Sequence, residues 1–356
     1  TTKDGQDGGD VHITGGLGSN GRAPGGEGGD MFVTGGEGRG AGTLDKGGAI
    51  ELRGGLAAGG TGGYMLLHTG YGTASSSGHM HIKTANSGVA GVSGEVEVNT
   101  GRATQGNSGH IHVDSGDATS GKGGDIRLRV GTGNYQDGGD VLVTAGETKA
   151  AGFTGGRVRI KAGLGSSGSS PGGVGGEIDI VGGEGQGSYA FDNGGSIKLT
   201  GGLAASGTGG SFVFTTGYGT ASSSGFVGIT TADAGVEGVS GNLTLKSGTT
   251  SLGDSGYIRL ETGEATEGKA GFVNISVGTG NSGMGGVVAI NAGNTTAADM
   301  TGGSIDLRTG YSLVHSSGNF TLRTPNAGDE GVSGFITLDT GTASLGNSGS
   351  FLLATG

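Results

Sequence analysis

Cysteine and tryptophan are both absent from this chain of 356 residues. Without cysteine the chain has no disulfide framework, no zinc–thiolate site and no thiol nucleophile. Proline occurs three times, which excludes collagen, because collagen needs a Gly-X-Y register rich in proline. No apolar run approaches the roughly 20 residues that a membrane-spanning helix requires. We therefore expect no membrane insertion.

Basic residues are also fewer than acidic ones. The chain has 20 Lys and Arg against 31 Asp and Glu, a net charge of −11, and both signs are scattered along the sequence. Nucleic-acid binding proteins usually carry a basic face or stripe. We expect no nucleic-acid partner.

Glycine is abundant instead, with 93 residues against an average share of about 7%. Such a content is common in flexible linkers. Here, however, Val, Ile and Leu alternate with polar residues, as in segments 10–14, 95–99 and 125–129. This alternation is typical of short strands with one apolar face.

These segments recur at a nearly fixed spacing. Segments of the first block start at 10, 30, 49, 64, 79, 95, 110, 125 and 140, and each has a counterpart 147 residues later. The nine residues 70–78 return unchanged at 217–225, and a third run begins at 304 with part of the block skipped. The sequence therefore predicts blocks 10–156 and 157–303 and a partial block 304–356.

A short period built on alternating strands is typical of a β-solenoid. We predict an all-β fold for 1–356, a single continuous, parallel β-helix-like solenoid of about 22 short coils with two short strands each. Apolar positions such as Ile111 and Ile258 should point inward and pack on Gly, Ala and Ser in a flattened core. Replacing either by Asp should then cost several kcal/mol. Loop glycines such as Gly70 and Gly78 should adopt positive φ or allow close passage of the backbone.

Four longer coils carry insertions, among them the loops 16–29 and 36–48, with counterparts in the coils that start at 157 and 177. Pro24 and Pro171 occupy equivalent positions in two of them. Protruding loops often carry binding functions. These loops, or one face of the solenoid such as its Thr/Ser face, are the basis of an alternative function, in which the chain is a surface adhesin or an ice-binding protein.

Two patterns resemble metal sites. Segment 25–33 fits the calcium-binding pattern G-G-x-G-x-D-x-U-x, but it lacks the tandem nine-residue repetition of that family. Six outward positions of three consecutive coils are His79, His81, Glu95, Glu97, His110 and His112. They indicate either a transition-metal site or charge pairing between strands, and we favour pairing because the second block has other residues there. No nucleophile elbow or triad is present, so we predict no enzyme activity, no cofactor, and no catalytic or metal-binding residue.

The sequence does predict sites of N-glycosylation. Four Asn-x-Ser/Thr sequons occur, at Asn242, Asn274, Asn294 and Asn319. They favour a secreted protein.

The motifs at 69–78 and 84–94 resemble those of long glycine-rich repeat proteins of diatoms and other stramenopile algae. The resemblance covers the whole chain. It implies a surface or extracellular protein, part of a fibre such as a flagellar hair. It supplies no catalytic residues.

We expect an extracellular structural protein that forms a stiff rod within a filament, hair, sheath or wall. Neither Thr1 nor Gly356 adjoins an evident cap, and an open solenoid end exposes unpaired strand edges. The chain should therefore continue in further coils or associate with itself, head to tail and laterally, into a filament. Extracellular glycans are a second class of expected partner.

Overall fold

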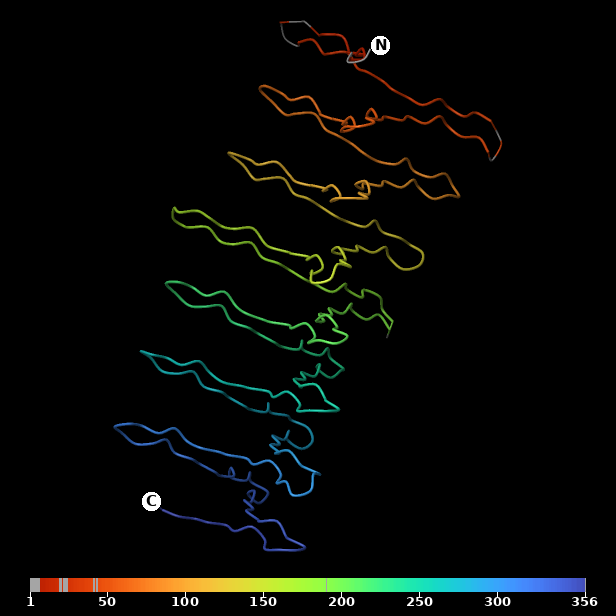
Figure 1. Ribbon diagram of the computed structural model, residues 1–356. Coiled ribbons are helices and arrows are strands. Elements are labelled where there is room, and N and C mark those ends of the chain that lie inside the picture. The colour runs from red at the N-terminus through yellow and green to blue at the C-terminus, as the bar shows by residue number, and fades with distance from the viewer. Residues whose placement is uncertain are drawn as a thin grey trace. The chain divides into compact units, whose positions relative to one another are not determined.

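The computed structural model describes residues 7–18, 21, 25–40, 42, 44–189 and 191–355. Thr1, Pro24 and Gly356 lie outside these residues, so the expectations placed on both chain ends and on Pro24 fall outside the description. Within the described residues the chain forms no helix and no strand (Figure 1). Accordingly none of them forms a helix with the length and apolar character to cross a bilayer.

The prediction of an all-β solenoid is therefore wrong. The alternating segments are extended, but no sheet forms among the described residues, because a strand requires a ladder of backbone hydrogen bonds to a neighbour. Apart from the contacts of Asp7, every hydrogen bond and ion pair among the described residues joins two residues that are at most 13 positions apart in the sequence. Apart from the local Lys122–Asp125 pair at a repeat boundary, nothing of this kind ties one described repeat to the next.

The predicted flattened core is absent as well. No described side chain is buried, and even the least exposed of the large apolar side chains, Val130, is 40% exposed. Ile111 and Ile258 are 54% and 57% exposed. Ile111→Asp or Ile258→Asp should therefore not destabilise the single chain, because the new carboxylate would remain in water.

What the backbone does form is a series of closed loops, which we define as segments whose last glycine donates its N–H to the carbonyl of the first. The donor–acceptor distances lie between 2.7 and 3.0 Å. The loops run over 16–29, 36–48, 55–63, 70–78, 146–156, 163–176, 183–195, 202–210, 217–225, 293–303 and 310–318. Local loop closure, not strand pairing, is thus the regular element of this backbone.

The closed loops recur with the spacing of the sequence repeat. Each of the five loops between 16 and 156 has a counterpart 147 residues later, as 55–63 has in 202–210. Backbone conformation follows the same spacing: Gly152 and its counterpart Asp299 both have positive φ, of 78° and 64°. Gln136 and Gly283 form a second such pair, at 64° and 76°. Equivalent sequence positions therefore adopt equivalent local structure.

The chain divides into two compact units, Thr1–Asp179 and Ile180–Gly356. This division falls inside an alternating segment and not between 156 and 157. The blocks 10–156, 157–303 and 304–356 describe the repeat of the sequence, and as structural domains they stay a prediction.

Candidate interaction surface

Each closed loop has a neck, formed by the residue before its first glycine and by its last glycine. At several necks both residues are glycine. A Cβ added to Gly54 would stand 2.2 Å from the carbonyl oxygen of Gly63, and one added to Gly201 would stand 2.3 Å from that of Gly210. Real Cβ atoms do not approach a carbonyl oxygen so closely, so these necks require glycine.

Other necks place a small side chain opposite the glycine. Thr69 faces Gly78, and a Cβ on that glycine would lie at an ordinary 3.4 Å from the Thr69 Cβ. The same arrangement occurs where loops lack the closing bond: Thr324 faces Gly334, and its hydroxyl donates to the Gly334 carbonyl at 3.0 Å. Among the described residues, those that are half-buried lie at or near such necks, as Thr84, Ala145 and Thr216 do. The necks are the tightest places in the chain.

Between the loops lie the extended apolar segments, whose side chains face water. Ile336 and Leu338 are 47% and 64% exposed, and Val96 and Val98 are 54% and 72% exposed. Residues two apart in an extended chain point to the same side. The repeats therefore present pairs of apolar side chains that remain largely exposed in the described chain.

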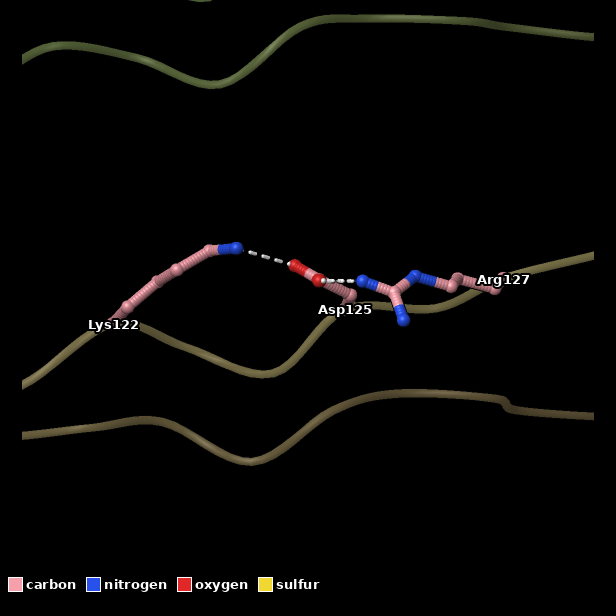
Figure 2. A network of polar contacts seen from close by, with 3 residues as sticks. All are labelled: Lys122, Asp125 and Arg127. Carbon is pink, nitrogen blue, oxygen red and sulfur yellow. Dashed lines mark hydrogen bonds and ion pairs between the residues drawn. The ribbon is translucent and has the colours of Figure 1, made fainter.

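Charged groups lie on the same segments and pair only locally. The Asp125 carboxylate accepts hydrogen bonds from Lys122 Nζ at 2.7 Å and from Arg127 Nη2 at 2.8 Å (Figure 2). The Lys122 and Arg127 side chains are 80% and 84% exposed, and exposed pairs contribute at most about 1 kcal/mol each. The ion pairs found in the described chain join residues two or three apart. They are local contacts, and within the described chain none of them joins one extended segment to another.

The calcium pattern gains no support from the structure. Asp125, which belongs to one of the Gly-Gly-Asp copies, has both carboxylate oxygens occupied by basic side chains. No group of three or more His, Asp or Glu side chains suited to a metal ion occurs in the described ranges. Asp30 of segment 25–33 is not part of such a group.

The charge pairing predicted for His79, His81, Glu95, Glu97, His110 and His112 is not observed. In this fully described stretch no ion pair joins a histidine to either glutamate. Glu97 instead accepts a hydrogen bond from Asn99 Nδ2 on its own segment. The histidines lie next to one another: the ring centroids of His79 and His81 are 6.3 Å apart, and those of His110 and His112 are 6.0 Å apart. Sequence reasoning placed these residues together across coils, and it missed the pairing within each segment, although His-x-His spacing is visible in the sequence.

All four predicted glycosylation sites are exposed. Asn294 lies at the start of the closed loop 293–303, and the other three lie on or beside alternating segments. On secretion from a eukaryotic host, we expect glycan at one or more of Asn242, Asn274, Asn294 and Asn319. Mass spectrometry of glycosidase-treated peptides would detect the conversion of each modified Asn to Asp. Four unmodified sequons after export would contradict the prediction.

Comparison with known proteins adds no relative: no family model matches the chain, no curated protein matches it, and no solved structure matches it. The resemblance to glycine-rich repeat proteins of stramenopile algae therefore stays an expectation from the repeat motifs. The function has to be argued from the chain itself.

Proposed function

We propose that this protein is an extracellular structural protein whose copies associate through their repeats into a filament, hair, sheath or wall material, without a catalytic role. The exposed apolar pairs carry this proposal. The accessible surface of the chain is 36493 Å², whereas a folded monomer of this mass exposes roughly 13,000 Å². A chain with this pattern gains stability only when something covers its apolar side chains.

A second copy is the partner that fits this surface best. The apolar pairs and the closed loops repeat along the chain, so a partner that covers many of them needs matching repeats at matching spacing. Another copy of the same chain meets this requirement, because it has the same repeats at the same spacing. The excess surface corresponds to more than ten interfaces of the standard size of about 1,600 Å². Many weak contacts of one kind, added along the chain, are the usual basis of a structural assembly.

Other partners fit less well. Scattered charges of both signs offer no stripe for a polyanion. The chain has no tryptophan, and aromatic residues make up 5% of it, whereas compact binding sites for single partners are usually anchored by aromatic and Arg side chains. Export is supported by the four exposed sequons.

Self-association is tested directly on the full chain. We expect purified protein to form assemblies whose size grows with concentration in analytical ultracentrifugation, and elongated or sheet-like particles in electron microscopy. A chain that stays monomeric over the whole soluble range would contradict the proposal. If such a monomer bound a glycan surface or ice saturably, the adhesive alternative based on the loops would replace it.

A further inference from the structure

Two histidine pairs stand out among the exposed side chains. His79 and His81 lie two residues apart on one extended segment, and their rings are tilted by 58° at a centroid distance of 6.3 Å. His110 and His112 repeat this arrangement, with a tilt of 46° at 6.0 Å. Residues at this spacing in an extended chain project to the same side of the backbone. Each pair therefore presents two imidazoles side by side.

The four imidazoles have no other partner among the residues that the structure describes. All four residues are exposed, and none forms a hydrogen bond or an ion pair with another described residue. No ion pair joins Glu95 or Glu97 of the segment between the two pairs to these rings, and Glu97 accepts a hydrogen bond from Asn99. The ring nitrogens are thus available to a ligand from solution.

We propose that each pair, His79 with His81 and His110 with His112, binds one divalent transition-metal ion as a bidentate site, with water completing the coordination. Neutral imidazole is a preferred ligand of Zn²⁺, Cu²⁺ and Ni²⁺, whereas Ca²⁺ and Mg²⁺ prefer oxygen. With metal–nitrogen bonds of about 2.0–2.1 Å, an ion bound by two adjacent imidazoles holds their centroids about 4.5–5 Å apart. The observed distances reach this range after a small rotation of two exposed rings.

The remaining histidines serve as internal controls. His12, His68 and His315 have no second histidine two residues away. The second block, 157–303, has no histidine at all, with Phe226 and Tyr257 at the positions of His79 and His110. Metal binding is therefore a property of two segments and not of the repeat, and it is independent of the proposed structural role.

Equilibrium dialysis of the full chain against Ni²⁺ at neutral pH, without an affinity tag, tests the assignment. We expect about two ions per chain. His81→Ala and His112→Ala should each remove about one ion, and the double variant should remove both. His12→Ala with His68→Ala should change nothing. All these residues are exposed, so the substitutions leave the loop closures intact.

The stoichiometry distinguishes the outcomes. Uptake that persists in the double variant would overturn the proposal, and so would an absence of saturable uptake by the unmodified chain. One ion per chain, lost on either single substitution, would also contradict it, because the four imidazoles would then form one shared site. Dialysis against Ca²⁺ should show no uptake that depends on these histidines.

Discussion

Replacing Ile336 and Leu338 together by Asp should raise the concentration at which the chain assembles by about a hundredfold. Both side chains are exposed in the single chain, so the free chain should tolerate the change. In an assembly that covers them, two unpaired carboxylates would lose their hydration, at a cost of several kcal/mol. Since about 1.4 kcal/mol corresponds to a factor of ten, sedimentation over a dilution series would resolve the shift.

Thr337 provides the matched control, because it lies between the two apolar residues and its side chain points to the other side of the extended segment. Thr337→Asp adds a charge at nearly the same place along the chain. We expect it to change the assembly concentration by a small factor only. An equal effect of the control and the double variant would show that charge alone governs assembly and that the apolar pairs remain uncovered.

Gly54→Ala should open the closed loop 55–63. Its new Cβ would lie 2.2 Å from the carbonyl oxygen of Gly63 and overlap it, so the two sides of the neck would have to separate. The Gly63 N–H then loses its 2.8 Å hydrogen bond to the Gly55 carbonyl. Such a bond contributes about 1 kcal/mol, so the Gly63 amide should exchange with solvent about five to ten times faster.

Gly55→Ala is the control for this substitution. A Cβ at Gly55 meets no atom within 4 Å, and loss of glycine flexibility at an unstrained position stabilises by about 0.4–1 kcal/mol. The exchange of the Gly63 amide should therefore stay unchanged or become slower. Gly201→Ala and Gly202→Ala repeat the comparison in the second block. The prediction fails if both members of a pair alter exchange alike.

The local part of this structure was predictable from the sequence. Gly70 and Gly78 were expected at the boundaries of loops, and they form the two ends of a closed one. Neither of the two reasons given for these glycines is confirmed. A Cβ at Gly70 would meet no atom within 4 Å, and one at Gly78 would make only ordinary contacts, the shortest of 3.4 Å to Thr69. Positive φ occurs at other positions, such as Gly106 and Gly253.

The connection between repeats could not be predicted in the same way. Alternation, as in Ile111-His112-Val113, determines which side chains share a side of an extended segment. It contains no information on whether a second backbone lies one hydrogen bond away, and a solenoid depends on that neighbour. The same limit applies to the histidines: the sequence showed His79 and His110 in nearby repeats, but only coordinates could show that the contacts stay within each segment.

Each closed loop depends on its own terminal glycines and on the residue that directly precedes the first of them, all of which lie in one loop with its flanking segment. A recombination event that removes or duplicates one loop with its flanking segment therefore leaves every remaining closure unchanged. The sequence carries the trace of such an event where the third run begins at 304 with part of the block missing. The length of this protein can therefore change during evolution by one loop with its flanking segment at a time. Variants that differ in the number of loops should still associate with one another.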